Sequence, residues 1–350
     1  MRLQLAIFAV AATRVASADP DVAASARVSV YADSDHTNIT TSALAASGNV
    51  ADGVRVDAQY LVDAVSSASV DVITAATGRI HDVRSELTAG ATLGNADRSL
   101  HASYIYSREH DWFSHTVGLG GSSDFLHHNL TVGLSGSLGF NQIHRMGDAE
   151  LSRRLTTFAM EAFAAYTVSP RDLVMLGTSV AFLDGFQASP YRFVVYDDLR
   201  AVYEIEPETR LRETATLRWH HHLFADSALR TMVRGYRDSW DLLALTAQVD
   251  YVVGLGALDV GFHVRGYHQT DANFYRPSYG AMQPYMTSDR ELGRLSDVFA
   301  GTALVYLTEL AERKLRIELD ADAFEFRFDD VPRLRSRHGV VAGIGVGLAL

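Results

Sequence analysis

Charged and apolar residues alternate along the closing stretch of the chain. From Lys314 to Ala323 every second residue is charged, and the residues between are apolar. A helix would scatter these charges around its surface, whereas a strand of period two places them all on one side. After a polar loop, the stretch from Val340 to Leu350 sets apolar residues against glycines at 339, 343, 345 and 347. Both segments predict strands with one apolar face and one charged or nearly side-chain-free face, which suits a barrel wall between lipid and a wet lumen.

The same alternation recurs from Ala26 to the end of the chain and predicts about 16 strands of ~10 residues or more. Tight turns alternate with longer polar loops, of which four stand out: 66–81, 141–153, 184–209 and 270–293. Outer-membrane barrels have this asymmetry, with short periplasmic turns and long outer loops. The predicted fold is therefore an all-β transmembrane up-and-down antiparallel β-barrel. A soluble secreted β-sandwich or propeller would explain less well why one face stays apolar over whole strands.

Aromatic residues gather near the predicted strand ends, as expected of girdles at the two membrane interfaces. They are Tyr104, Tyr106, Trp112, Phe113, Trp219, Trp240, Tyr251 and Tyr306.

The N-terminus has the pattern of a secretory signal peptide. Met1 and Arg2 form a short positive region, Leu3 to Ala12 is an apolar core, and Ala16-Ser17-Ala18 fits a cleavage site. We therefore expect a signal peptide at residues 1–18 and one barrel domain at residues 19–350. The chain has no cysteine, and no later apolar run is long enough for a transmembrane helix. These features predict the outer membrane of a Gram-negative bacterium.

Charge patterning places a set of polar side chains on the predicted inner face. The candidates for lining the lumen are Arg212, Arg218, His220, His222, Arg230, Arg234, His263, Arg265, Lys314, Arg316, Glu318, Asp320 and Asp322. A basic wall facing an acidic wall would create a transverse field that orients dipolar solutes. Alternatively, the opposite charges pair and brace the wall. The net charge of −11 and the lack of a basic run with aromatics argue against nucleic-acid binding.

Catalytic and metal chemistry has little support in the sequence. Within His220-His221-His222 only the first and third share a face of a strand, and no neighbour offers an obvious third ligand. His263 with Asp259 or Asp250 could form part of a hydrolase site, but 14 histidines and 42 acidic residues make such pairs easy to find by chance. We expect no catalytic residues, no metal and no cofactor.

Four stretches resemble an uncharacterised family of predicted bacterial outer-membrane barrels, the domain-of-unknown-function family 3570. They are Asp63–Ser69, Ser189–Arg192, His221–Ser227 and Tyr285–Arg290. The resemblance implies fold and location, and no known activity. Many outer-membrane barrels end in an aromatic residue that the insertion machinery recognises, and Leu350 departs from that pattern.

The function predicted from these features is a porin-like channel for passive passage of small hydrophilic solutes. The alternatives are a non-conducting barrel with a structural or surface-interaction role and an outer-membrane hydrolase. The expected partners are outer-membrane lipid and lipopolysaccharide, the barrel-assembly machinery and small hydrophilic solutes.

Overall fold

The structure, a computed structural model, describes residues 22–67, 80–196, 200–224, 226–331 and 335–349. The predicted signal peptide and most of the predicted loop at 66–81 lie outside the described residues. Within the described ranges, no helix is long and apolar enough to cross a membrane.

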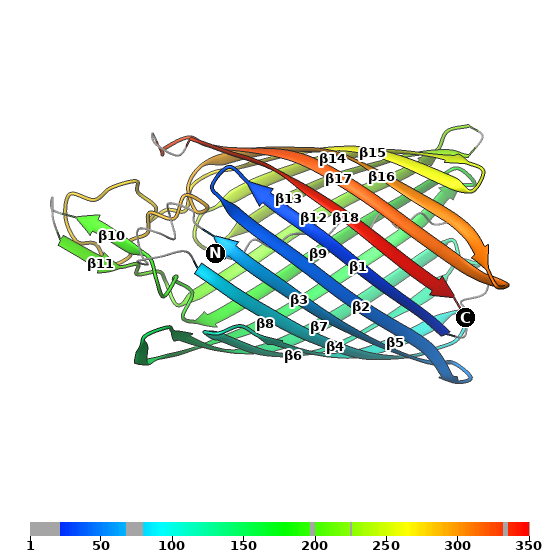
Figure 1. Cartoon of the computed structure of the whole chain (residues 1–350), viewed down its shortest axis with the longest axis horizontal. Helices are drawn as coiled ribbons and strands as arrows, with labels where there is room; N and C mark the ends of the chain where they lie inside the picture. The colour runs from blue at the N-terminus through cyan, green and yellow to red at the C-terminus, as the bar shows by residue number, and fades with distance from the viewer. Residues whose placement is uncertain (1–21, 68–79, 197–199, 225, 332–334, 350) are drawn as a thin grey trace.

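Sixteen antiparallel strands form one closed barrel (Figure 1). Strands adjacent in the barrel are also consecutive in the chain, except that β9 pairs with β12 and β1 pairs with β18 to close the wall. The barrel strands are β1 (Val22–Asp33), β2 (Thr37–Ala51), β3 (Val54–Ser67), β4 (Ile80–Gly94), β5 (Arg98–Arg108), β6 (Trp112–Phe125), β7 (Leu130–Arg145), β8 (Asp148–Ser169), β9 (Asp172–Gly185), β12 (Thr209–His222), β13 (Ser227–Asp238), β14 (Leu243–Leu255), β15 (Leu258–Gln269), β16 (Leu295–Leu310), β17 (Arg313–Phe328) and β18 (Ser336–Ala349). A separate two-stranded sheet contains β10 (Phe193–Tyr196) and β11 (Arg200–Tyr203). The predicted fold class is confirmed.

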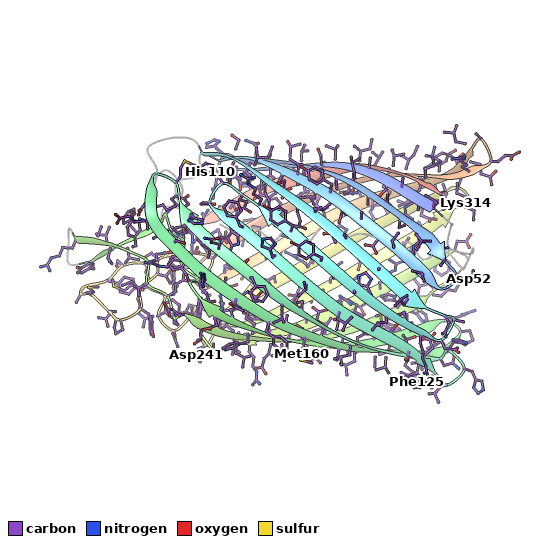
Figure 2. The ribbon with its side chains drawn as sticks, turned by 90° about the horizontal axis from the view of Figure 1, so that it is seen from below. Asp52, His110, Phe125, Met160, Asp241 and Lys314 are labelled. Carbon is purple, nitrogen blue, oxygen red and sulfur yellow. The ribbon has the colours of Figure 1, made fainter. Side chains whose placement is uncertain are left out.

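The two ends of the barrel differ in their connections. At one end, which we call the short-turn end, turns of two to four residues join the strands. The opposite, long-loop end carries the two longest connections, residues 186–208 and 270–294. Figure 2 shows Asp52, Phe125 and Lys314 at the short-turn end, and His110 and Asp241 at the other. The predicted long loops at 184–209 and 270–293 are confirmed, while four other connections at the same end, residues 34–36, 109–111, 146–147 and 239–242, are as short as the turns at the opposite end.

The outer face of the wall carries large apolar side chains in an alternating pattern. Leu134, Leu245 and Val264 are each 56% exposed on three different strands, and similar residues occur all around the barrel. Soluble monomers rarely expose contiguous apolar patches larger than a few hundred Å². The apolar belt therefore has the character of a surface that contacts lipid.

One predicted loop is wrong. Residues 141–153 form the ends of β7 and β8, joined by a two-residue turn. In this part of the hairpin Ile143 and Leu155 are buried inside the wall, while Gln142 and Arg154, which face each other on the other side of the strands, are exposed outside. The arrangement of polar and apolar faces is thus the reverse of that in the apolar belt, as expected of a wall that continues into water. The charged residues led to the prediction of a loop because a strand exposed to water has the same polar composition as a loop.

The predicted aromatic girdles are correct for some residues and wrong for others. Trp219 and Tyr306 are exposed on the outer face near the short-turn end, and Tyr104 is exposed on it toward the long-loop end. Trp112 instead packs against the inner apolar cluster around Ile143, and its indole donates to Asn141 at 3.0 Å. Trp240 is 2% exposed beneath the loop 270–294. These two side chains stabilise the inside of the long-loop end rather than a lipid interface.

Candidate functional site

All the residues predicted to line the lumen lie on the side of the wall opposite the exposed apolar side chains. β12 carries Arg212, Arg218, His220 and His222, β13 carries Arg230 and Arg234, β15 carries His263 and Arg265, and β17 carries Lys314, Arg316, Glu318, Asp320 and Asp322. Among the described residues, ion pairs engage the candidates on β15 and all those on β17 except Lys314, whereas the candidates on β12 and β13 form none.

The acidic strand β17 is neutralised by an arginine from two strands away. Arg27 on β1 lies 2.5 Å from a carboxylate oxygen of Asp320 and 3.6 Å from one of Glu318. Strand β18 runs between them, and a Cβ atom on its Gly343 would lie 2.5 Å from the Arg27 guanidinium. The glycine face of β18 therefore provides the space in which this ion pair crosses a strand. The pair also braces the closure between β1 and β18.

His263 meets a carboxylate in the same way. Its Nε2 lies 2.5 Å from Asp322 Oδ1, across the intervening strand β16. Gly301 occupies the crossing point, where a Cβ atom would lie 2.7 Å from His263 Cε1. The sequence suggested Asp259 or Asp250 as the partner, and it did not find Asp322. The partner lies two strands away because the missing side chain at residue 301 opens a path over β16.

Three of the inner arginines of β12 and β13 form a group that we call the arginine patch: Arg218, Arg230 and Arg234. Within the described part of the chain, none of the three forms an ion pair. Arg218 and Arg234 are exposed within the barrel, and Arg230 is partly exposed. Free cations therefore remain on this wall, whereas the carboxylates of Glu318, Asp320 and Asp322 on β17 are paired.

An aromatic cluster fills the inner face near the long-loop end. It consists of Tyr31, Phe299, Phe324, Phe326 and Phe328. The ring of Phe324 stacks on Tyr31 at 5.3 Å and on Phe299 at 5.1 Å between centroids. The sequence missed this cluster, although the alternation of β17 continues through it. The sequence feature that could have revealed it is the change along the inner face of β17 from charged residues to phenylalanines.

Three arginines cover the aromatic cluster. The guanidinium groups of Arg265, Arg290 and Arg337 lie 4.2, 4.5 and 4.6 Å from the centroids of rings in the cluster. Arg265 pairs with Asp297 at 2.9 Å, and Arg337 with Glu291 at 3.3 Å. Cation–π contacts of this kind are strongest when they are shielded from water. The inner wall of β15 to β18 is therefore densely packed at the long-loop end.

The described parts of the two longest loops, residues 186–196, 200–208 and 270–294, fold together into a unit that we call the cap. Ile205 and Met286 form an antiparallel bridge, Arg192 pairs with Asp289, and the Thr287 hydroxyl donates to Glu204 at 2.9 Å. The cap joins loops that are distant in sequence and has its own buried centre, since Met286 and Thr287 are fully buried.

The cap is fastened to several turns of the rim. Tyr191 donates to Asp111 at 2.5 Å, and Arg145 donates to the carbonyl of Pro190 at 2.6 Å. On the far side of the rim, Arg290 pairs with Asp35 in the turn between β1 and β2. Contacts to three separate turns hold the cap at the mouth of the barrel.

Two glutamates in the cap, Glu204 and Glu206, have raised pKa values. Burial raises the pKa of Glu206 to about 7, and the nearby carboxylate of Glu204 acts in the same direction. Arg192, Arg210 and Arg212 oppose this rise. Burial also raises the pKa of Glu204. The cap therefore contains carboxyl groups that titrate closer to neutral pH than ordinary glutamates.

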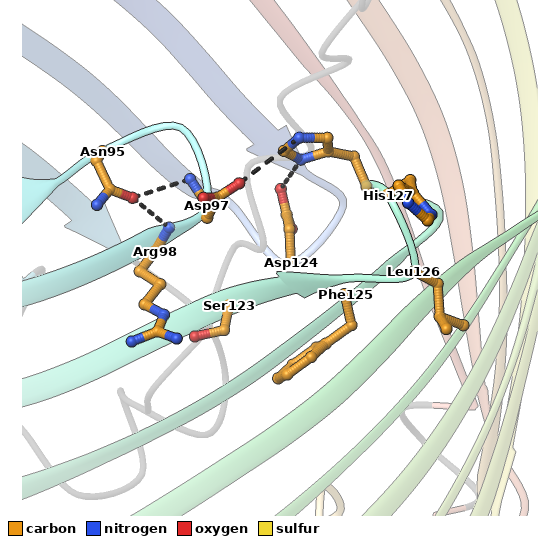
Figure 3. Close-up of a pocket in the computed structure, with 9 residues that line it drawn as sticks. Asn95, Asp97, Arg98, Ser123, Asp124, Phe125, Leu126 and His127 are labelled. Carbon is orange, nitrogen blue, oxygen red and sulfur yellow. Dashed lines mark hydrogen bonds and ion pairs between the residues drawn. The ribbon is translucent and has the colours of Figure 1, made fainter.

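A pocket of about 520 Å³ lies between two turns at the short-turn end (Figure 3). His128 stands between two of its carboxylates, 3.1 Å from Asp124 and 3.6 Å from Asp97. Leu126, His127 and His128 all have positive φ values, which is unusual for three consecutive non-glycine residues. The polar groups of the pocket bind one another, and the contacts hold this strained turn.

Three carboxylates gather at the long-loop end, where oxygen atoms of Asp82, Glu109 and Asp111 lie within 4.8 Å of one another. Asp111 accepts a hydrogen bond from Tyr191, and Glu109 lies 3.8 Å from Arg84. These contacts give the cluster a structural use in fastening the cap.

The fold is similar to that of several solved bacterial proteins. A bacterial polysaccharide outer membrane secretin has a TM-score of 0.55 and 10% identity, covering 95% of this chain and 100% of that one. CdiB from Acinetobacter baumannii has a TM-score of 0.50 and 11% identity, covering 94% and 61%. The siderophore receptor PirA from Pseudomonas aeruginosa has a TM-score of 0.47 and 10% identity, covering 95% of this chain, which spans only 62% of that receptor. At these identities the likeness concerns the fold alone, and no curated protein matches the sequence.

Of the stretches that carry the family resemblance, two meet in the cap, where Arg192 of one pairs with Asp289 of the other. A third, His221–Ser227, spans the end of β12 and the turn into β13. The model of the family described as Protein of unknown function (DUF3570) matches residues 156–344, which is more than half of the chain. The chain therefore belongs to the DUF3570 family.

Proposed function

We propose that the protein is an outer-membrane barrel through which small hydrophilic solutes pass passively. The observation that carries the proposal is the exposure of arginine side chains on the inside of a closed 16-strand barrel whose outside is apolar. A barrel of this size encloses a water-filled channel unless it is plugged. Charged residues on the inner face then act on the solutes that enter.

The lengths of the turns and loops indicate how the barrel would be oriented in the membrane. Short turns face the periplasm and long loops face outward in barrels of this class. The cap would then lie on the outer surface, and the arginine patch would lie deeper in the lumen. Contacts with membrane lipid fit the apolar belt, and lipopolysaccharide would adjoin the long-loop end.

Single-channel conductance of the refolded protein in planar bilayers tests the proposal. We expect discrete current steps, and under a salt gradient a reversal potential that favours anions, because the patch carries the unpaired charge. A barrel that runs as a heat-modifiable band but gives no current would contradict a channel function. Protein that stays soluble without detergent would contradict the membrane location itself.

A non-conducting barrel with a surface-interaction role is the second candidate, and the cap favours it. The cap is bound to three turns of the rim, and the aromatic cluster fills one wall beneath it. If the wild-type barrel is silent in the bilayer and a variant with residues 272–290 replaced by a short glycine–serine linker conducts, the cap closes the lumen.

A further inference from the structure

The arginine patch is compact. Arg218 on β12 lies directly opposite Met232 on β13, and Met232 stands between Arg230 and Arg234 along the same face. Diagonal neighbours in an antiparallel pair are about 7–8 Å apart at the backbone, within reach of long side chains. Three guanidinium groups can therefore converge on one small volume above Met232.

The charge of the patch is unusual for this barrel. Three other inner-face arginines have carboxylate partners: Arg27 pairs with Asp320, Arg265 with Asp297, and Arg210 with Asp238. These three arginines are neutralised by their partners, whereas those of the patch are not. Like charges repel one another, so an unneutralised triad of neighbouring arginines has a cost that a bound anion would reduce.

The surroundings of the patch leave it accessible. Asp250 lies opposite Arg230 on β14 and accepts a hydrogen bond from Gln248 at 2.9 Å, so one carboxylate faces three cations. On the other side of β12, the inner face of β9 contributes Gly177 and Met175, neither of which is charged. An anion approaching from the lumen would meet a net positive surface.

We propose that Arg218, Arg230 and Arg234 form a binding site for a small solute that bears at least two negative charges as phosphate or carboxylate groups. Guanidinium groups bind such oxygens in a bidentate, charge-assisted manner, and a solute with two or more negative charges balances more of the three positive charges than a monovalent ion does. His220, opposite Arg230, supplies a further polar group at the edge of the site. The inference deepens the proposed function, since it names the class of solute that the lumen selects.

Calorimetric titration of the refolded protein in detergent micelles with tripolyphosphate, and separately with citrate, tests the site without requiring conduction. We expect one of the two anions to bind at low salt and its affinity to fall as salt rises. The Arg218→Gln/Arg234→Gln variant should bind at least about tenfold more weakly. The reason is that each lost charge-assisted hydrogen bond weakens binding by about this factor. The Arg218→Lys/Arg234→Lys variant keeps the charge, so it should bind better than the glutamine variant but less tightly than the wild type.

The matched control is Arg171→Gln/Arg313→Gln, which removes the same charge from exposed positions at the short-turn end. Its affinity should equal that of the wild type. Binding that is absent in the wild type, or equal in the wild type and the Arg218/Arg234 variants, would overturn the site. Because binding and conductance are separate measurements, binding by a silent barrel would retain the site and reject the channel. Conductance without binding would retain the channel and reject the anion site.

Discussion

At several inner glycines the missing side chain lets groups from the two flanking strands approach each other. Gly301 separates His263 from Asp322, and Gly343 separates Arg27 from Asp320. Gly90 lies in the same way between the side chains of Asp57 and His101. The glycine face of a strand is therefore more than a small-residue lining, since it sets which charges can pair across it.

Substitution of Gly301 by alanine tests this role. A Cβ atom there would lie 2.7 Å from the carbonyl oxygen of Ala321 as well as against the His263–Asp322 pair, so backbone must shift. We expect Gly301→Ala to lower the free energy of unfolding by about 1–3 kcal/mol. The control is Gly347→Ala, whose Cβ would find its nearest neighbours at 3.9 Å. Urea unfolding in micelles should separate the two variants, and equal stabilities would refute the steric account.

At the scale of the strand, the alternation of faces determines which positions tolerate charge. Leu138 is 41% exposed on the outer face of β7, and the preceding Ser137 lies on the inner face opposite Gly118. We expect Leu138→Arg to reduce stability in lipid vesicles by about 2–4 kcal/mol if it lies near the membrane midplane. Ser137→Arg should change it by less than about 0.5 kcal/mol. Similar losses from both variants in equilibrium unfolding would mean that the faces are wrongly assigned.

The period-two pattern was sufficient to predict the strands, their faces and the difference between the two ends. It failed where the wall leaves the apolar belt, at residues 141–153, because a strand with charged residues outside resembles a loop. It also could not identify Asp322 as the partner of His263, since pairing across an intervening strand depends on register and on a glycine at the crossing point. The arginine patch illustrates the same limit. The sequence places its members on one face, but only the structure shows which carboxylates are already engaged.

Over the whole molecule, the lumen has two regions of different character. Toward the long-loop end, the cap and the aromatic cluster fill space with buried rings and paired charges. Farther from the cap, the arginine patch faces the lumen and has no ion-pair partner among the residues that the structure describes. The cap lies at the long-loop end, from which a solute would approach the patch, so we expect the stability of the cap to affect access to the charged wall.

The acidity of Glu206 makes this stability depend on pH. Its pKa is about 7 in the folded cap because burial penalises the charged form, and 4.5 is its ordinary value. The folded cap therefore holds a proton that a detached cap releases. This contribution to stability is fully present below pH 4.5 and is lost as the pH rises through about 7. We expect the cap to detach from the rim more often at about pH 8.5 than at about pH 5.5.

Spin labels can measure this opening directly, since the chain contains no native cysteine. Ala201→Cys in the cap and Glu150→Cys on the rim are both exposed, so a label pair there should report a longer or broader distance at high pH. Glu206→Gln removes the titrating group and should abolish the change. Glu208→Gln, an exposed glutamate in the same segment, should preserve it. If the distance still changes with pH in the Glu206→Gln protein, another group controls the cap, and Glu204 is the next to replace because burial also raises its pKa.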